Sequence, residues 1–428
     1  MILLIKLIDK HIAGKIHLFM RSCKACIFLL AAVLVSCGDN KTAQIWTDRP
    51  EIALYSEFFN TAQEQYKVAV KYVEFPAMEL NKQNKPDIII ASWLKNASMG
   101  SNFKSLDNLF GAQKLSRNIF YPHLLAIGRI ERNQYLLPVS FNIPALIFSR
   151  SREQYLSNQF TIDFDEIKKL SKDFNAISRG VYTRMGFSPL WNDNFLIMTA
   201  VLFGVSFQEA NPLSWDSTAL EKSMKFINNW NNEINTSTQA EDDFTFKYFF
   251  EPPERLIQNG RILFSYAESN ELFLLSDESK SLLDFRWVKE QDSITLTENS
   301  VYLGVPKRFK SKKAAEEFIL WFFKIENQRR ILEYSRVNRI SENIFGICGG
   351  FSSLNQVTEQ IYPLFYPELL GRMPPSEYFM LPNVLPANWL IIKERVIMPY
   401  LHDRARKERP NDVYPLERRL ADWLRLNH

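Results

Sequence analysis

Apolar and polar positions follow two periods along this chain, and the two alternate in its first 150 residues. Residues 43–46 (AQIW) form a short apolar run, and apolar residues then recur at helical spacing over residues 52–62, with Asp48 as the expected N-cap. Residues 66–75 alternate as a half-buried strand does. Residues 87–91 (DIIIA) are continuously apolar, which is typical of a strand buried on both faces of a parallel sheet. This order of elements predicts βαβ connections.

Helical spacing dominates the remainder of the chain. The clearest helix is expected over residues 311–334, where Phe318, Trp321, Phe322 and Ile325 form one apolar face. A face with this spacing usually belongs to a core, so we expect it to be buried. Further helices are expected over residues 163–174, 195–203, 213–230, 388–407 and 415–426, and further strands over residues 138–150 and 260–266.

Length and composition fit a globular protein with two domains or with one large α/β unit. The chain has 428 residues, of which 46% are hydrophobic and 23% are charged. No internal repeat or low-complexity linker separates its segments, so two lobes would be joined by a chain that crosses between them more than once. We expect these crossings near residues 140–150, 265–300 and 325–340.

The first 36 residues have the pattern of a secretory signal peptide. From Met20 onward, a short basic start is followed by a nine-residue apolar run and by small residues before Cys37. Nine apolar residues are too few for a membrane-spanning helix, which needs about 20. Residues 1–19 lengthen the basic start without improving it, so Met1 and Met20 both stay open as the translation start.

Residues 34–37 (LVSC) resemble the lipobox of bacterial lipoproteins. In that family the cysteine thiol carries a diacylglyceryl group, and cleavage makes the cysteine the first residue of the mature protein. The resemblance therefore implies that Cys37 is lipidated, with palmitate-type acyl chains, and anchors the protein to a bacterial membrane on its extracytoplasmic side. A cleaved soluble secretory signal and an uncleaved N-terminal anchor are the alternatives.

The formal charge of +4 comes from this N-terminal segment. Residues 1–36 hold five basic residues and one acidic residue, which leaves 47 Lys and Arg against 47 Asp and Glu in the rest of the chain. A neutral remainder lacks the electrostatic footprint of a nucleic-acid-binding protein. We therefore expect no nucleic-acid partner.

Cysteine and histidine usage argues against a metal site. Only Cys348 would remain of the four cysteines once the signal is removed and Cys37 is lipidated, so no disulfide can form within the mature chain. The histidines that follow the signal are few and widely spaced. One thiol and scattered imidazoles do not make the usual zinc ligand set. We expect no metal and no cofactor.

Five stretches resemble, in order, segments of the extracellular solute-binding proteins of family 1, the sugar-binding components of ABC importers. They are residues 45–60, 85–93 (KPDIIIASW), 135–150 (YLLPVSFNIPALIFSR), 259–266 (NGRILFSY) and 312–328. Ser149 stands where the family usually has Asn. Residues 341–428 show little resemblance to the general family. The resemblance rests on the order of the stretches and on the lipobox before them.

The resemblance implies an α/β fold of the periplasmic-binding-protein type (type II), with two lobes and a ligand cleft between them. We expect residues 37–142 and about 290–328 in the first lobe. Residues 143–289 and about 329–428 would form the second lobe, with a helical C-terminal extension. The implied function is capture of a carbohydrate or related small polar solute by lobe closure, followed by delivery to the permease subunits of an ABC importer.

Candidate ligand residues follow from the chemistry of sugars, whose C–H faces stack on aromatic rings and whose hydroxyls need polar partners. In α/β lobes, ligands meet the loops at the carboxyl ends of strands. Loops that carry this mixture contain Trp46, Asp48, Arg49, Glu51, Trp93, Ser140, Asn142, Tyr266 and Glu268. The family resemblance implies a further loop at residues 188–194, with Trp191 and Asn192 as contacts. A structural role competes at each position, since Trp46 and Trp93 adjoin buried strands.

Two other classes of function stay open. The chain has no motif for a serine nucleophile, a phosphate-binding loop, a zinc hydrolase or a dinucleotide, so we expect a binding protein rather than an enzyme. The acidic run at residues 241–243 could suggest glycoside hydrolysis, but its Asn- and Thr-rich flanks favour a solvated loop. A lipid-anchored enzyme acting on glycans and a structural or adhesion lipoprotein are the alternatives. A peptide or polyol ligand would also suit the aromatic content.

Overall fold

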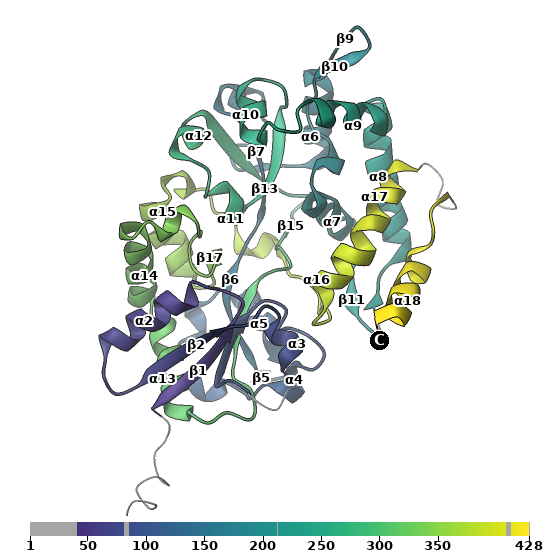
Figure 1. The fold of residues 1–428 in the computed structure, drawn as a ribbon. Helices are drawn as coiled ribbons and strands as arrows, with labels where there is room; N and C mark the ends of the chain where they lie inside the picture. The colour runs from purple at the N-terminus through teal and green to yellow at the C-terminus, as the bar shows by residue number, and fades with distance from the viewer. Residues whose placement is uncertain (1–40, 81–84, 212, 408–411, 428) are drawn as a thin grey trace, which may run out of the picture.

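The computed structural model describes residues 41–80, 85–211, 213–407 and 412–427. The predicted signal peptide and Cys37 lie outside these ranges. Figure 1 shows two lobes stacked along the long axis of the molecule, with the C-terminal helices along one side. Each lobe is built around its own sheet.

The first lobe contains a six-stranded mixed sheet with the order β17-β6-β16-β3-β1-β2. β1 pairs in parallel with β2 and β3, whereas β16 runs antiparallel to β3 and β6. The helix α2 (Ile52–Ala62) connects β1 to β2, so the predicted βαβ arrangement is confirmed. The strands are β1 (Thr42–Thr47), β2 (Lys67–Tyr72), β3 (Ile88–Ala91), β6 (Leu136–Phe141), β16 (Val301–Gly304) and β17 (Phe351–Ser352).

The second lobe contains a four-stranded sheet with the order β13-β7-β14-β8. Its strands are β7 (Pro144–Ser149), β8 (Thr161–Ile162), β13 (Phe264–Glu268) and β14 (Leu283–Val288). The chain crosses between the two sheets at residues 142–143 and again over residues 289–300, which we call the crossing segment. β17 pairs with the first sheet, although it lies within the residues expected in the second lobe. The exact domain limits stay a prediction.

Short strands and helices complete the fold. The remaining strands are β4 (Arg129–Ile130), β5 (Asn133–Gln134), β9 (Ala176–Ser178), β10 (Val181–Arg184), β11 (Gln208–Glu209), β12 (Leu213–Ser214), β15 (Ile294–Thr295) and β18 (Phe379–Met380). The remaining helices are α3 (Pro76–Glu79), α4 (Met99–Asn102), α5 (Pro122–Ile127), α6 (Phe164–Phe174), α7 (Asp193–Leu202), α8 (Ser217–Glu233), α9 (Thr238–Lys247), α10 (Pro253–Gln258), α11 (Ser269–Leu272), α12 (Asp277–Leu282), α13 (Lys312–Phe322), α14 (Ile325–Val337), α15 (Tyr362–Phe365), α16 (Trp389–Ile392), α17 (Met398–Arg406) and α18 (Leu416–Asn427).

The prediction of a single helix over residues 311–334 is wrong, because the chain breaks between α13 and α14. Lys324 adopts an extended backbone, and the Asn327 side chain donates a hydrogen bond of 2.7 Å to the carbonyl of Trp321. Phe322 and its neighbour Phe323, at the end of α13, are both fully buried.

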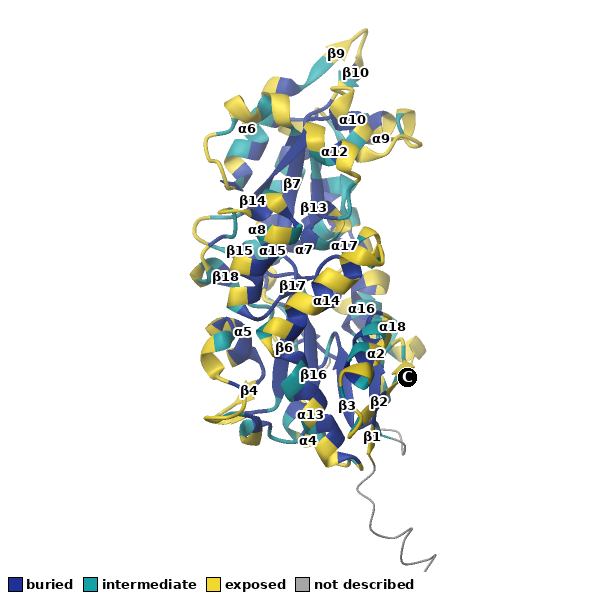
Figure 2. Cartoon of the chain, turned by 90° about the vertical axis from the view of Figure 1, so that its left-hand side faces the viewer, coloured by how far each residue is buried: buried dark blue, intermediate teal, exposed yellow. Residues whose placement is uncertain are grey.

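Buried strands form the centre of each lobe, as Figure 2 shows in dark blue. A separate apolar cluster joins α7 and α8 to the C-terminal helices, through side chains such as Met224, Trp389 and Leu401. Burial of several large apolar side chains stabilises such a contact by several kcal/mol, at about 1.5–3 kcal/mol each. The C-terminal helices are therefore held firmly against the second lobe.

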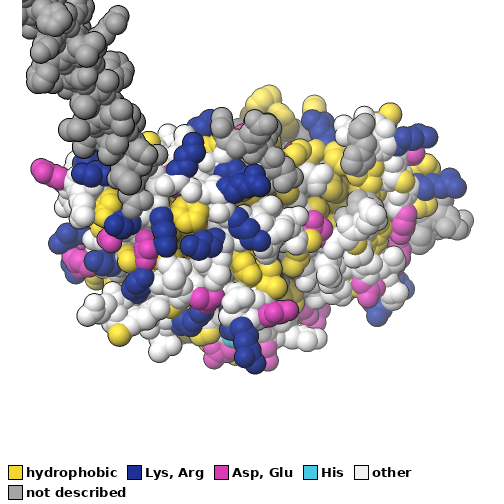
Figure 3. All heavy atoms as spheres, turned by 90° about the horizontal axis from the view of Figure 1, so that it is seen from below, with side chains coloured by type: hydrophobic (Ala, Val, Ile, Leu, Met, Phe, Trp, Pro, Cys, Tyr) yellow, Lys and Arg dark blue, Asp and Glu magenta, His cyan; other side chains and the backbone are white. Residues whose placement is uncertain are grey.

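The surface is mixed in charge. On the face seen from below in Figure 3, basic and acidic side chains are interspersed. Within the described ranges, no helix combines the length and the apolar character needed to cross a bilayer.

Candidate functional site

A pocket of about 900 Å³, counting space open to solvent, lies between the second lobe and the C-terminal part of the chain. Its lining comes from α7 and the loop after it, the end of β13, the crossing segment and residues 380–389. The lining residues are Asn194, Ile197, Met198, Val201, Gly204, Ser206, Phe207, Tyr266, Glu268, Thr295, Leu296, Thr297, Glu298, Met380, Leu381, Pro382, Asn383, Leu385 and Trp389. None of them belongs to residues 41–141, so the N-terminal part of the first lobe supplies no wall of this pocket.

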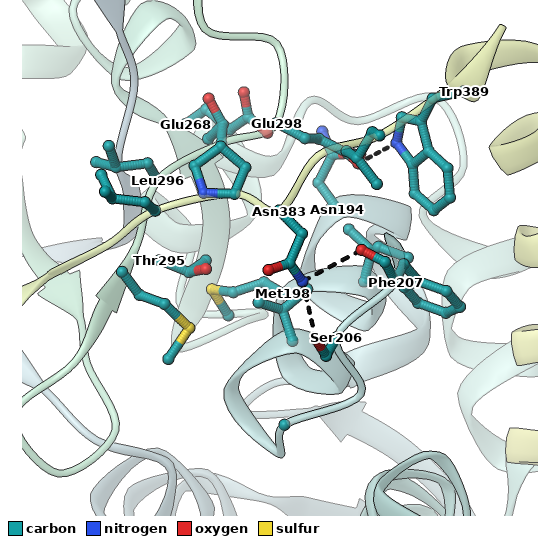
Figure 4. A pocket seen from close by; sticks show the side chains of 18 of the residues that line it. Asn194, Met198, Ser206, Phe207, Glu268, Thr295, Leu296, Glu298, Asn383 and Trp389 are labelled. Carbon is teal, nitrogen blue, oxygen red and sulfur yellow. Dashed lines mark hydrogen bonds between the residues drawn. The ribbon is translucent and has the colours of Figure 1, made fainter. Parts of the chain in front are cut away.

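The segment from Phe379 to Lys407, which we call the C-terminal arm, forms the wall opposite the second lobe. It enters the pocket as β18, which pairs in parallel with β15 of the crossing segment. The Asn383 side chain then donates hydrogen bonds to the hydroxyl of Ser206, at 3.0 Å, and to the carbonyl of Phe207, at 3.2 Å (Figure 4). These bonds fix the arm to the loop that follows α7.

The arm also contacts the first lobe. The Lys95 ammonium donates a 2.9 Å hydrogen bond to the carbonyl of Pro382. Burial lowers the pKa of Lys95 to about 8. Glu209 strengthens the same junction, because its backbone N–H donates to the carbonyl of Val384 at 2.7 Å while its carboxylate accepts from the backbone N–H of Ala97. The arm therefore connects both lobes beside the pocket.

A charged group sits at the base of the arm. The Glu298 carboxylate accepts hydrogen bonds from the Trp389 indole N–H and from the Lys393 ammonium. Lys393 also donates to the side-chain oxygen of Asn194 on α7, at 3.1 Å. This network joins the crossing segment, the arm and the second lobe, so it couples the three parts that surround the pocket.

Glu268 is the second carboxylate of the pocket. It is only 7% exposed, at the end of β13. Burial, together with the negative charges of Glu271 and Glu298, raises the pKa of Glu268 to about 7, against the opposing positive charge of Lys393. A carboxyl group with this pKa changes its charge near neutral pH, which is a common property of functional sites.

Aromatic rings complete the pocket. Tyr266 packs its ring against Phe195, with centroids 5.8 Å apart, and Trp389 packs against Phe207 at 5.5 Å. Methionine, leucine, isoleucine, valine and proline side chains provide most of the remaining lining. Largely apolar walls with a few convergent polar groups are typical of sites for small organic ligands.

Two of the residues predicted to bind ligand, Tyr266 and Glu268, line the pocket. Asp48 and Arg49 do not line it and instead form an ion pair with each other. Asp48 was expected to cap α2, but Glu51 holds that position, and Asp48 instead accepts a 3.1 Å hydrogen bond from the backbone N–H of Ser92. Arg49 donates to the Ser92 hydroxyl at 2.6 Å and forms an ion pair with Asp48.

Buried carboxylates adjoin this pair. Burial raises the pKa of Glu51, which is 7% exposed, and that of Asp48. Trp46 is 5% exposed, with the Lys71 ammonium 5.0 Å from the centre of its ring. Trp93 is half-buried, has a left-handed backbone (φ 63°) and packs against apolar clusters of both lobes. These residues gather at the edge of the first sheet and do not line the pocket, but Arg49 donates to the carbonyl of Asn299, the neighbour of the lining residue Glu298.

The loop at residues 346–350 covers the neighbouring part of that edge. Ser140 donates to the carbonyl of Cys348 at 3.2 Å, and Asn142 donates to the carbonyl of Gly349 at 2.9 Å. Asn142 also accepts a 2.6 Å hydrogen bond from the Ser269 hydroxyl of the second lobe. Ser140 and Asn142 are thus engaged in bonds that hold the loop and join the lobes.

The remaining two predicted residues have local partners. The Trp191 ring stacks on Phe244, with centroids 5.9 Å apart and planes at 17°. Asn192 caps α7 by accepting hydrogen bonds from the backbone N–H groups of Asn194 and Phe195. Neither lines the pocket, and ligand contact at these positions stays a prediction.

The loop predicted at residues 188–194 does reach the pocket, but through Asn194 rather than through Trp191 or Asn192. Sequence reasoning missed Glu298, Asn383 and Trp389, which come from segments without a local motif, and two of these lie in the part of the chain that resembles the family least. The one available signal was the short interval between Trp389 and Lys393, which places both on one helical face. Within the described ranges, no group of three or more His, Cys, Asp or Glu side chains could hold a metal ion.

Solved structures of binding proteins share this fold at low sequence identity. The sugar-binding protein MalE from Xanthomonas citri is 12% identical, with a TM-score of 0.62 over 87% of this chain and 93% of that protein. The ABC substrate-binding protein Lmo0181 from Listeria monocytogenes, in complex with cycloalternan, is 15% identical, with a TM-score of 0.60 over 89% and 96%. CpMnBP1 with mannotriose bound is 13% identical, with a TM-score of 0.59 over 89% and 98%.

These similarities confirm the predicted fold class, an α/β fold of the periplasmic-binding-protein type. No protein-family model matches the chain, and no curated protein is similar to it in sequence. At such low identity the likeness concerns the fold, and the ligand has to be argued from the pocket.

Proposed function

We propose that this chain is the solute-binding component of an ABC importer and that it binds a carbohydrate. The observation that carries the proposal is the pocket between the second lobe and the C-terminal arm. It combines aromatic rings with carboxylate and amide groups, in a fold shared with MalE from Xanthomonas citri and with CpMnBP1, whose solved structure holds mannotriose.

The lining groups suit the two sides of a sugar ring. Tyr266 and Trp389, which are 7% and 1% exposed, place aromatic rings in the pocket wall, while Glu298, Asn194 and Asn383 offer hydrogen-bond acceptors and donors to hydroxyls. Hydrogen bonds of this kind supply orientation, and the apolar contacts supply much of the affinity. A volume of about 900 Å³ is within the range for small-molecule sites, which is roughly 300–1,000 Å³.

Capture would use the two-lobed architecture. Lobes joined by several crossings can close about the crossings as hinges, which excludes water from a bound solute. The arm is held against the second lobe, so closure would change its contact with Lys95 of the first lobe. The arm both lines the pocket and contacts the first lobe, so it would couple ligand binding to the position of the lobes.

Delivery to a permease and attachment to a membrane through lipidated Cys37 form the finer part of the proposal. They are supported by the lipobox pattern and by the order of the family-like stretches. An anchor would keep the protein beside its permease and raise its effective concentration there.

A thermal-shift screen against mono- and oligosaccharides, with product formation followed in parallel, tests the proposal. A ligand at 100 times its dissociation constant adds about 2.7 kcal/mol to the free energy of unfolding, which gives a measurable shift. Binding without turnover is expected. Turnover would favour the glycan-degrading enzyme, and the lack of any stabilising saccharide, peptide or polyol would favour the adhesion protein.

A blocking substitution assigns the binding to this pocket. Val201→Trp on α7 should fill the pocket and weaken binding of any stabilising saccharide at least tenfold. Val337→Trp is the matched control, because Val337 is 81% exposed on α14 and does not line the pocket. Equal binding by both variants would place the ligand elsewhere.

A further inference from the structure

The pocket carries more negative than positive charge. Two of its lining residues, Glu268 and Glu298, are carboxylates, and no lysine or arginine is among the lining residues. The single ammonium at its base, Lys393, lies behind Glu298 and is engaged with Glu298 and Asn194. Lys95 donates to the carbonyl of Pro382 and is likewise not part of the lining.

The two carboxylates differ in how well they are compensated. Glu298 accepts from two strong donors, the Trp389 indole and the Lys393 ammonium. Among the described residues, the hydrogen-bond donor to the Glu268 side chain is the backbone N–H of Glu271, at the start of α11. Glu268 is only 7% exposed. Within the described ranges, no Lys, Arg or His forms an ion pair with it, since Lys393 pairs with Glu298. A buried carboxylate without a cationic partner is costly.

We propose that the solute bound in this pocket carries a protonated amine, as in an amino sugar, and that Glu268 is the residue that selects it. This inference rests on the proposed function and names its substrate class. The ammonium group would sit against the Glu268 carboxylate and supply the missing positive charge. The carbon framework that bears it would lie against Tyr266 and Trp389, and aromatic faces also attract cations.

The lining favours an organic ammonium over other ions. A metal ion would need several oxygen or nitrogen ligands, whereas the other pocket carboxylate is already engaged with Lys393 and Trp389. An anionic sugar such as a uronic acid would be repelled by both carboxylates at short range in a poorly solvated site. The pKa of Glu268 supports this picture, because a group that ionises near neutral pH can give up its proton when a cation arrives.

Calorimetric titration with matched oligosaccharides tests the inference. The probes are glucosamine oligomers, their N-acetylated counterparts, neutral malto- and manno-oligosaccharides, and galacturonate oligomers. For the unmodified protein, a glucosamine oligomer should bind at least tenfold more tightly than its N-acetylated counterpart, and galacturonate oligomers should not bind.

Two substitutions identify the residue responsible. Glu268→Gln keeps the size and shape of the side chain and should reduce the amine preference to less than threefold. Glu271→Gln removes one negative charge from the same helix end without altering the pocket lining, and it should keep most of the preference. Retention of the full preference in Glu268→Gln would overturn the role of this residue.

The two proposals fail in different ways. Tight binding of a neutral saccharide with no preference for the amine would overturn the inference and leave carbohydrate binding intact. If no saccharide of any charge binds, carbohydrate binding and the amine preference are both wrong.

Discussion

Individual buried carboxyl groups make this protein sensitive to pH. Glu241, on α9, is 1% exposed and accepts a 2.6 Å hydrogen bond from the Asn235 amide. Burial raises the pKa of Glu241 from its ordinary 4.5 to about 7, as it does for Glu268 in the pocket. Because each group holds its proton more tightly in the folded state, each favours folding most below pH 4.5. That contribution is lost as pH rises through 7.

The thermal midpoint of the unliganded protein should therefore fall between pH 5 and pH 8. Glu241→Gln keeps an acceptor for Asn235 and removes the titration, so its midpoint should fall by several degrees less over the same window. The substitution removes a pH-dependent contribution of Glu241 to the free energy of unfolding of at most about 3 kcal/mol, since each pKa unit corresponds to about 1.4 kcal/mol. Thermal unfolding followed by circular dichroism at a series of pH values provides the measurement.

Asp243→Asn is the matched control, because Asp243 is an exposed acid two positions along the same helix. It should keep the pH profile of the unmodified protein. A Glu241→Gln profile identical to that of Asp243→Asn would contradict the assignment.

The sequence predicted the kinds of side chain that line the pocket, but only some of the individual residues. Tyr266 and Glu268 were predicted because they lie at the end of a strand with a clear apolar pattern, and both line the pocket. Asp48 and Ser140 have the same chemistry, but Ser92 and Cys348 occupy their hydrogen-bonding groups. Those partners lie 44 and 208 positions away in the chain, so no local pattern could reveal them.

At the scale of elements, a glycine-rich loop determines what the first lobe presents at the edge of its sheet. Gly346 has a left-handed backbone, with φ at 58°, and its N–H donates to the Tyr366 hydroxyl. A Cβ at this position would lie 2.3 Å from the carbonyl oxygen of Gly350 and 2.4 Å from the Tyr362 hydroxyl. The loop can pack this closely only because Gly346 has no side chain.

Gly346→Ala should therefore destabilise the protein more than Gly371→Ala. Gly371 has a similar φ of 69°, but a Cβ there would meet nothing within 4 Å. Backbone strain alone should cost about 1–2 kcal/mol in Gly371→Ala, and the steric clash should add at least about 2 kcal/mol in Gly346→Ala. Urea unfolding midpoints measure the difference, and equal midpoints would show that the loop can shift without cost.

The elements also show where local pattern fails. The strands β1 and β3 and the helix α6 lie close to their predicted ranges, because short apolar runs mark the two strands and helical spacing marks α6. The break between α13 and α14 was missed, since apolar spacing continues across Phe323 and only the extended Lys324 interrupts it. The pairing of β18 with β15 joins segments far apart in the chain and leaves no period to detect.

At the scale of the whole molecule, the two-lobed fold was predictable because the order of many weak signals is more informative than any one of them. The role of the C-terminal arm was not predictable in this way. Its contacts to Lys95, Glu209 and Glu298 arise only once both lobes are in place. The arm is the feature that distinguishes this pocket from a simple cleft between two lobes.

Attachment of the whole molecule to a membrane depends, in our proposal, on Cys37. Cys37→Ala should prevent lipidation, so the protein should keep its precursor size and no longer partition with membranes. Detergent extraction and mass spectrometry of the N-terminus measure both effects. Normal processing and normal membrane extraction of this variant would exclude the lipoprotein assignment.

A crystal structure of the protein with its most strongly stabilising oligosaccharide tests the central claim most directly. The account predicts the sugar between the second lobe and the C-terminal arm, in contact with Tyr266, Glu298 and Trp389. A sugar bound instead at the edge of the first sheet, against Asp48 and Trp93 with the arm pocket empty, would contradict it.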